Sequence, residues 1–208
     1  MCGIVAASAR RNVRNILIAG LHALEYRGYD SAGIALQQDG YLARLRAPGK
    51  VKELEALLES TPIDGHCGIS HTRWATHGVP NTKNAHPHTS GDQLALVHNG
   101  IIENHQELRK ELQHAGCEFS SDTDTEVMVH LIAQLMDSGL DLFSAVQKAI
   151  GRLRGAFAIA VVSAAEPGVI VGARQGSPLV LGVGKGEHFL ASDIYPLLGE
   201  TNRFIYLQ

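Results

Sequence analysis

The sequence predicts an α+β fold in which helices pack on largely antiparallel sheets. Short β-rich runs are joined by connections that are often too short to contain a helix, which favours hairpins over parallel crossovers. Two consecutive helical patterns between Thr125 and Arg154 are preceded and followed by runs of strands, so strand and helix do not alternate. With 208 residues, of which 45% are hydrophobic, the chain is long enough for one sizeable core or two small ones.

The strands are expected where β-branched, aromatic and other apolar residues cluster between turn residues. The first run, at 3–8, is apolar throughout, and the run at 156–163 is similar in character. The expected strands are 3–8, 32–36, 41–45, 68–72, 94–98, 156–163, 169–173, 179–183, 189–192 and 203–207.

The helices are expected where apolar residues recur at a spacing of three or four. In the first of them, Val13, Ile16, Leu17, Leu21 and Leu24 share one face. The segment 104–114 is a more polar helix, followed by a glycine in a position that can end it. The expected helices are 13–24, 51–58, 104–114, 128–135 and 143–153.

Composition excludes several classes of protein. The chain carries 18 Lys+Arg against 21 Asp+Glu, a net charge of −3, so it lacks the basic patch of a nucleic-acid-binding protein. No apolar stretch reaches the roughly 20 residues that cross a bilayer, and the apolar start is followed, not preceded, by Arg10 and Arg11, unlike a signal peptide. Three scattered cysteines do not make a disulfide framework. We therefore expect a single cytoplasmic unit without nucleic-acid or membrane partners.

Cys2 is the first candidate for chemistry. Initiator methionine is normally trimmed before a residue as small as cysteine, which would leave Cys2 with both a thiol and a free α-amine. An α-amine titrates near pH ~7.7–8 and a thiol near ~8.5, so the amine can accept the thiol proton. An N-terminal amine that serves its own residue's nucleophile is a known catalytic arrangement. Alternatively, Cys2 is a small apolar residue that opens a buried strand.

Asn99 and Gly100 follow an apolar strand and could stabilise an oxyanion. Asn99 can donate through its side-chain amide and Gly100 through its backbone N–H. The alternative is a two-residue β-turn, for which Asn-Gly is the preferred sequence. The following residues, 101–104, favour the start of a helix over a returning strand, which weakens the turn interpretation.

Two further segments suit an amino-acid ligand. Arg73 can hold a carboxylate through two parallel hydrogen bonds, and Trp74 can supply an apolar wall, although a surface salt bridge and a core-edge tryptophan explain them equally well. The segment 123–126, TDTE, matches a capping box with Thr123 at the N-cap and Glu126 three residues later. Asp124 is not needed for that box, and its carboxylate could pair with a substrate ammonium group.

The eleven histidines do not predict a metal site. The cluster His66, Cys67, His71, His86 and His88 lacks HExxH or CxxC spacing, and Pro87 prevents His86 and His88 from sharing a helical face. Phosphate-binding glycine loops are also absent. We expect neither a metal nor an organic cofactor.

Several separated motifs, in one order along the chain, together resemble a known family. The chain is similar throughout to the class II glutamine amidotransferase domain of the glucosamine-6-phosphate synthase family, the glutamine:fructose-6-phosphate aminotransferases. The sequence of residues 25–33 (EYRGYDSAG) favours that sugar-phosphate branch over the purine, asparagine and glutamate synthase branches. The motifs are 1–5 (MCGIV), 25–33 (EYRGYDSAG), 71–78 (HTRWATHG), 84–88 (NAHPH), 98–104 (HNGIIEN) and 123–126 (TDTE).

The resemblance implies a fold and a set of residue roles. The fold would be that of the N-terminal-nucleophile hydrolases, a four-layer αββα sandwich over residues 2–208. Glutaminase activity would use Cys2 as nucleophile, its freed amine as base, and Asn99 and Gly100 as the oxyanion hole. Arg73 would bind the glutamine α-carboxylate and Asp124 its α-ammonium group. The loop that closes over glutamine would contain Trp74, Thr76 and His77, with Trp74 also controlling the passage of ammonia.

The resemblance also implies partners and leaves alternatives open. Full-length members continue into sugar-isomerase domains that bind fructose 6-phosphate, a region to which Arg27 would respond, and they are expected to form homodimers. This chain stops at Gln208, before such domains, so it would perform the glutaminase half-reaction. The alternatives are the glutaminase domain of another class II amidotransferase or sugar aminotransferase, and a non-catalytic module that senses glutamine.

Overall fold

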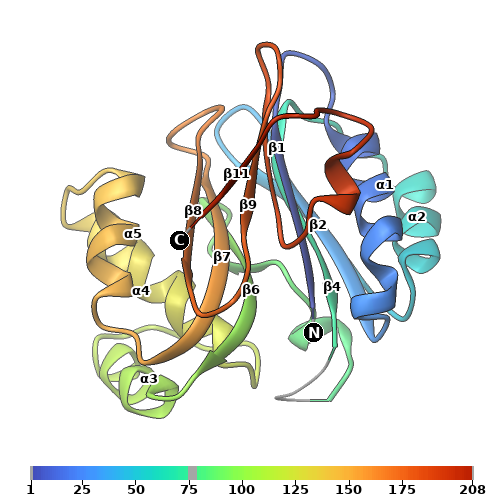
Figure 1. Ribbon diagram of the computed structural model, residues 1–208. Coiled ribbons are helices and arrows are strands. Elements are labelled where there is room, and N and C mark those ends of the chain that lie inside the picture. The colour runs from blue at the N-terminus through green and yellow to red at the C-terminus, as the bar shows by residue number, and fades with distance from the viewer. Residues whose placement is uncertain (1, 75–78, 208) are drawn as a thin grey trace.

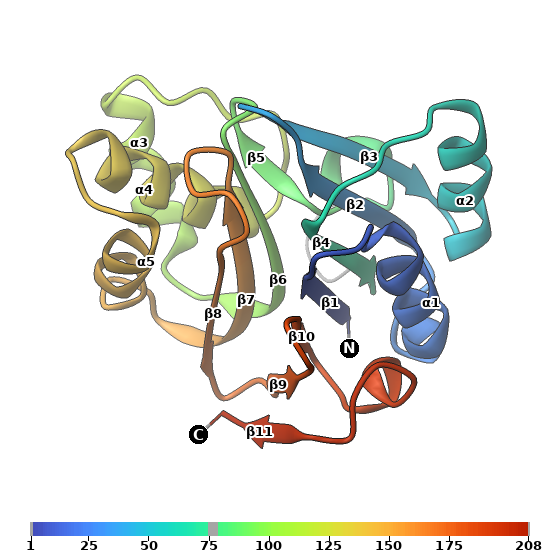
Figure 2. The same cartoon turned by 90° about the horizontal axis from the view of Figure 1, so that it is seen from above.

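The protein is built of four layers, as a computed structural model that describes residues 2–74 and 79–207 shows (Figure 1). Helices α1 and α2 cover the outer face of one sheet, and α3, α4 and α5 cover the outer face of a second sheet. The inner faces of the two sheets pack against each other (Figure 2). The expected α+β class and αββα layering are therefore confirmed.

The first sheet has seven strands in the order β11-β9-β10-β1-β4-β2-β3, and every neighbouring pair is antiparallel. The first strand of the chain, β1, lies in the middle of this sheet between β10 and β4. The bounds are β1 Gly3–Ser8, β2 Ser31–Gln37, β3 Leu42–Pro48, β4 Cys67–Arg73, β9 Val180–Val183, β10 His188–Ala191 and β11 Phe204–Tyr206.

The second sheet has four antiparallel strands in the order β5-β6-β7-β8. Strand β5 was not expected from the sequence, because a run of three residues carries no periodicity; it pairs with the start of β6. The bounds are β5 His88–Ser90, β6 Leu94–Ile102, β7 Gly155–Ser163 and β8 Ile170–Gln175.

The five α-helices of the described residues lie close to their expected positions. Helices α1 and α2 contact each other and β3 or β4, while α4 packs on β5 and β6 and contacts α3 and α5. Their bounds are α1 Arg14–Leu24, α2 Val51–Ser60, α3 His105–His114, α4 Thr125–Asp137 and α5 Leu142–Ile150. Among the described residues, no helix is long and apolar enough to cross a membrane.

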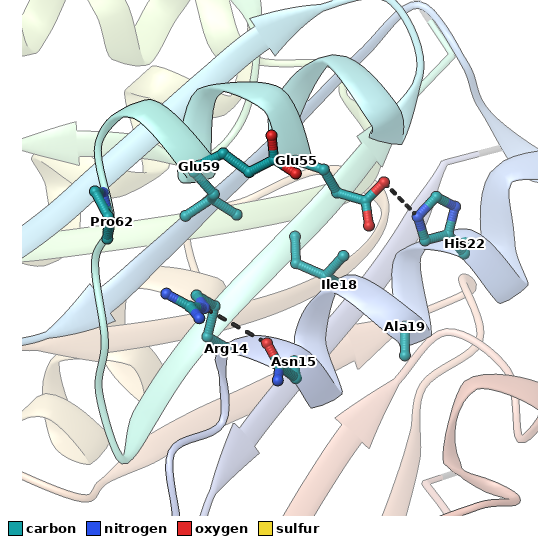
Figure 3. A pocket seen from close by; sticks show the side chains of 9 residues that line it. Arg14, Asn15, Ile18, Ala19, His22, Glu55, Glu59 and Pro62 are labelled. Carbon is teal, nitrogen blue, oxygen red and sulfur yellow. Dashed lines mark hydrogen bonds and ion pairs between the residues drawn. The ribbon is translucent and has the colours of Figure 1, made fainter.

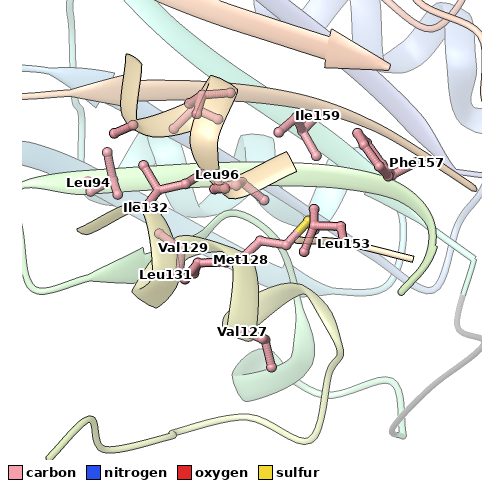
Figure 4. Packing of buried hydrophobic residues seen from close by; sticks show 14 of the residues in the cluster. Leu94, Leu96, Val127, Met128, Val129, Leu131, Ile132, Leu153, Phe157 and Ile159 are labelled. Atoms are coloured by element: carbon pink, nitrogen blue, oxygen red, sulfur yellow. The ribbon is translucent and has the colours of Figure 1, made fainter. Parts of the chain in front are cut away.

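Alternation along the strands produces three separate apolar layers. In β1, Val5 and Ala7 pack toward α1, while Ile4 and Ala6 point into the space between the sheets. In β6, Leu96 belongs to the layer under α4, and its neighbour Val97 belongs to the layer between the sheets. Because side chains alternate across a strand, each sheet is buried on both faces. Figure 4 shows the layer in which α4 packs on β6 and β7.

Candidate active site

The two sheets meet at Cys2, directly before β1. Because Gly3 pairs with Thr72, the end of β4 lies beside Cys2. The Trp74 backbone N–H donates to Cys2 Sγ at 3.2 Å, and Sγ lies 3.5 Å from the Trp74 carbonyl oxygen. From the second sheet, Asn99 Nδ2 donates to the Cys2 carbonyl oxygen at 2.9 Å. Cys2 thus contacts Trp74 on one side and Asn99 on the other, although Cys2 and Asn99 are 97 positions apart in the sequence.

Asn99 and Gly100 lie within β6, so the β-turn interpretation is wrong. The strand continues to Ile102, paired with β7, and the expected start of a helix at 101–104 is replaced by α3 from His105. Gly100 has φ +136°, and a Cβ placed there would lie 2.0 Å from the Ala156 carbonyl oxygen. Glycine is required because a side chain at this position would collide with β7.

A small cavity beside Cys2 carries charges of both signs. Arg73 and Asp124 line it and are 4% and 5% exposed. Its volume is about 20 Å³, room for about one water molecule, so an amino acid enters only if the wall moves. The lining residues are Cys2, Arg73, Trp74, His86, His98, Gly100, Thr123, Asp124 and Thr125. A buried guanidinium and a buried carboxylate beside one sulfur suit the two charged groups of an amino acid.

Asp124 is held in place by the second sheet, since the Ile102 N–H donates to Asp124 Oδ2 at 2.8 Å. The expected capping box is wrong. Helix α4 begins at Thr125 with Asp124 at the N-cap and without a side-chain cap. The carboxylate of Glu126 instead accepts hydrogen bonds from the backbone and hydroxyl groups of Ser120 and Ser121, and Thr123 Oγ1 lies 3.1 Å from His88 Nε2. These bonds fix the segment that carries Asp124.

The surroundings of Cys2 set its proton affinity. Burial raises the pKa of the Cys2 thiol, whereas the Trp74 N–H and the charge of Arg73 oppose that shift. Burial likewise lowers the pKa of Arg73, and the negative charges of Asp30 and Asp124 oppose the change. At neutral pH the thiol is therefore mostly protonated, and a reaction at sulfur needs a base.

A second cavity, of about 330 Å³, also borders Cys2. Trp74, 44% exposed, borders both cavities and packs edge-on against Tyr29 with ring centroids 5.5 Å apart. The second cavity is lined by Cys2, Arg27, Trp74, Asn99, Gly100, Ile101, Ser177 and Pro178. Arg27 is fixed there by a 3.0 Å hydrogen bond from Nη1 to the Ser192 carbonyl oxygen.

The structure brings together six of the eight residues expected at the site: Cys2, Arg73, Trp74, Asn99, Gly100 and Asp124. Thr76 and His77 lie outside the described residues. His86, expected only as a metal candidate, also lines the cavity, as do His98 and Thr125, for which no role at the site was expected. His98 is a polar residue within the apolar run of β6, and this was the signal in the sequence that could have identified it. Within the described residues, no three His, Cys, Asp or Glu side chains are arranged to hold a metal ion.

A groove of about 570 Å³ between α1 and α2 lies apart from these cavities (Figure 3). It mixes apolar side chains such as Ile18 with charged ones, and His22 Nε2 lies 2.9 Å from the Glu55 carboxylate. It contains no cysteine, serine or threonine that could act as a nucleophile. The cavities at Cys2, in contrast, are lined by a thiol.

Comparison with known proteins decides the family. Residues 71–199, more than half of the chain, match the family described as glutamine amidotransferase domain. The chain belongs to this family. Among curated relatives of this amidotransferase domain, the glutamine--fructose-6-phosphate aminotransferases [isomerizing] of Pseudomonas putida and Bordetella pertussis are 57% and 56% identical. They match all of this chain, which covers 34% and 35% of their lengths. The chain thus spans about a third of these relatives.

Solved structures support the fold of the amidotransferase domain. The glutamine phosphoribosylpyrophosphate amidotransferase from B. subtilis, complexed with ADP and GMP, superposes with a TM-score of 0.82 at 26% identity. The match covers all of this chain and 45% of that one. A glutamine aminotransferase class-II domain protein from Silicibacter pomeroyi has a TM-score of 0.63 at 16% identity, covering 100% and 91% of the two chains, and supports the fold alone. The expected resemblance and the expected fold are confirmed.

Proposed function

We propose that this chain hydrolyses L-glutamine to glutamate and ammonia, with Cys2 as the nucleophile. The observation that carries the proposal is that Cys2 lines one cavity with the buried pair Arg73 and Asp124 and a second cavity with Asn99, whose amide donates to the Cys2 carbonyl oxygen. Family membership supports an amidotransferase, and this geometry supports the residue roles.

The reaction starts with removal of Met1, which frees the α-amine of Cys2. The amine accepts the Sγ proton, and the sulfur attacks the side-chain amide carbon of glutamine. The resulting oxyanion is stabilised by Asn99 Nδ2–H and the Gly100 N–H. Ammonia leaves with the proton from the amine, and a γ-glutamyl thioester remains. Water then cleaves the carbon–sulfur bond, which releases glutamate and restores the thiol.

The two charged walls recognise the amino-acid end of glutamine. Arg73 binds the α-carboxylate through parallel hydrogen bonds, and Asp124 binds the α-ammonium group. Because the cavity is too small for glutamine, Trp74 moves aside as the substrate enters. Trp74 also borders the second cavity, which lies beside Arg27 and gives ammonia a route away from Cys2.

We further propose that residues 2–208 form the ammonia-supplying domain of a longer protein that converts fructose 6-phosphate to glucosamine 6-phosphate. The names of the relatives support this proposal, as does their length, three times that of the match. The remaining two-thirds would bind the sugar phosphate and form the dimer, and Arg27 would sense that region.

Glutamate release tests the proposed activity, and covalent labelling separates the alternatives. An electrophilic glutamine analogue, 6-diazo-5-oxo-L-norleucine, should attach once, to the N-terminal peptide, and stop glutamate release. A non-catalytic glutamine sensor would bind glutamine without hydrolysing it and without being labelled. Parallel assays of the full-length protein with fructose 6-phosphate and with phosphoribosyl pyrophosphate would show which of the two accepts the ammonia, and so would identify another class II amidotransferase.

Replacing Asp124 with asparagine should weaken glutamine binding while the fold survives. Asparagine can still accept the Ile102 N–H, but the charge that pairs with the ammonium group is lost. A charged hydrogen bond contributes about 1.5–3 kcal/mol, so KM should rise about 10- to 100-fold with a smaller change in kcat. The matched control is Asp122→Asn, an exposed position paired with Lys83, which should leave KM unchanged. Equal KM values for D124N and the wild type would remove Asp124 from substrate binding.

A further inference from the structure

Histidines gather in the buried layer behind Asn99. His71 of β4 stacks on His86 with ring centroids 4.2 Å apart, and His86 meets His88 at 4.7 Å. His98 of β6 shares the Thr125 hydroxyl with His86, at 3.0 and 2.9 Å. Buried polar groups are costly unless they are hydrogen-bonded. None of these rings takes part directly in the proposed reaction, so the hydrogen bonds of the four histidines are expected to serve another purpose.

His71 is the ring that contacts the proposed oxyanion hole. Its Nε2 lies 3.0 Å from the His98 carbonyl oxygen and 3.0 Å from Asn99 Oδ1. A carbonyl oxygen can only accept a hydrogen bond, so Nε2 carries the proton. The same N–H also faces the Asn99 side chain, where it can be shared with Oδ1 but would repel the NH2 group. Asn99 consequently turns its oxygen toward His71 and its nitrogen toward Cys2.

The other side of the His71 ring selects the same tautomer. Nδ1 is buried and has no hydrogen-bond partner among the described residues. A buried N–H without an acceptor costs about 1–3 kcal/mol, so the proton is favoured on Nε2. Burial also lowers the pKa of His71 to about 3, which keeps the ring neutral at neutral pH.

We propose that His71 is a positioning residue that fixes the orientation of the Asn99 side-chain amide in the oxyanion hole. The inference rests on the proposed glutaminase function. One Nδ2–H of Asn99 binds the Cys2 carbonyl oxygen, and the second is available to the oxyanion. A flipped amide would place Asn99 Oδ1 against the Cys2 oxygen and would offer a lone pair to the developing negative charge. The His98 carbonyl oxygen of β6 therefore fixes the tautomer of His71, and His71 in turn fixes which atom of the Asn99 amide faces the oxyanion.

Kinetics of two variants test this role. His71→Leu removes the N–H, and His71→Gln places an amide N–H near the position of Nε2. H71L should lose about 10²–10³-fold in kcat, as expected for a disabled oxyanion donor, with KM within about twofold of the wild type. H71Q should recover at least tenfold of that loss. The matched control is His22→Leu, a ring that pairs with Glu55 in the groove between α1 and α2 and away from the cavities at Cys2, which should retain wild-type kcat.

A double mutant shows whether His71 acts through Asn99. In an Asn99→Ala background, H71L should cause no further loss of kcat, because the amide that it orients is gone. Multiplicative losses, or wild-type kcat in H71L, would overturn the proposal. An inactive wild-type protein would overturn the proposed function instead.

Nitrogen NMR of the wild-type protein supplies a readout that does not depend on activity. Long-range ¹H–¹⁵N spectra at neutral pH should show His71 as the neutral ring protonated at Nε2. A proton on Nδ1, or a doubly protonated ring, would overturn the inference even if every variant folded poorly.

Discussion

Cys2→Ala should abolish glutamine hydrolysis. Without the sulfur, no thioester can form, and removal of a catalytic nucleophile typically costs about 10⁴- to 10⁶-fold in kcat. The variant keeps Arg73 and Asp124, so calorimetry should still detect glutamine binding. Glutamate release under steady-state conditions is the measurement.

The matched control for this change is Cys117→Ala. Cys117 is a half-buried free thiol that packs on the layer under α4, away from the cavities at Cys2. C117A should release glutamate at the wild-type rate. If C2A retained more than a hundredth of wild-type activity, sulfur attack from Cys2 would not be the mechanism.

Gly100→Ala should cost both stability and activity. The new Cβ would lie 2.0 Å from the Ala156 carbonyl oxygen, so β6 must move away from β7. Overpacking of this kind costs about 1–3 kcal/mol beyond the strain of a positive φ. Displacement of the Gly100 N–H should lower kcat at least about 100-fold. Urea unfolding and glutamate release measure the two effects.

Gly139→Ala is the control that separates steric collision from backbone strain. Gly139 also has positive φ, +98°, but a Cβ there meets nothing within 4 Å. In G139A, the free energy of unfolding should therefore fall only by the strain of alanine at a positive φ, and kcat should equal that of the wild type. Equal destabilisation of G100A and G139A would show that the contact with Ala156 is unimportant.

The layered fold was predictable because its signals are local. Every expected strand is present, and the apolar spacing around Leu17 and Leu21 correctly marks a helix that packs on the first sheet. The antiparallel arrangement followed from connections too short for crossovers. Strand β5 was not predicted, because it is defined by its pairing with β6 and not by a pattern in its own sequence.

Local patterns failed where tertiary contacts compete with them. Asn99-Gly100 has the sequence of a turn, but pairing with β7 and a close approach to Ala156 keep it in a strand. Thr123 and Glu126 have the spacing of a capping box, but the hydroxyls of the exposed Ser120 and the buried Ser121 bind the Glu126 carboxylate instead. In both cases a local preference of about 1 kcal/mol is outweighed by contacts from distant parts of the chain.

The composition of the site was predictable, but its geometry was not. Cys2, Asn99 and Asp124 were selected for their chemistry and for the motifs around them. Their meeting depends on how two sheets pack, which no spacing encodes. The role of His71 is invisible in the sequence, because it depends on two acceptors at 3.0 Å from one ring nitrogen.

Intact mass spectrometry before and after reaction with 6-diazo-5-oxo-L-norleucine tests whether Cys2 is an N-terminal nucleophile. We expect a protein that lacks the mass of Met1 and then gains one analogue, located on the peptide that begins with Cys2. An active sample that retains Met1, or a label on any other residue, would contradict it.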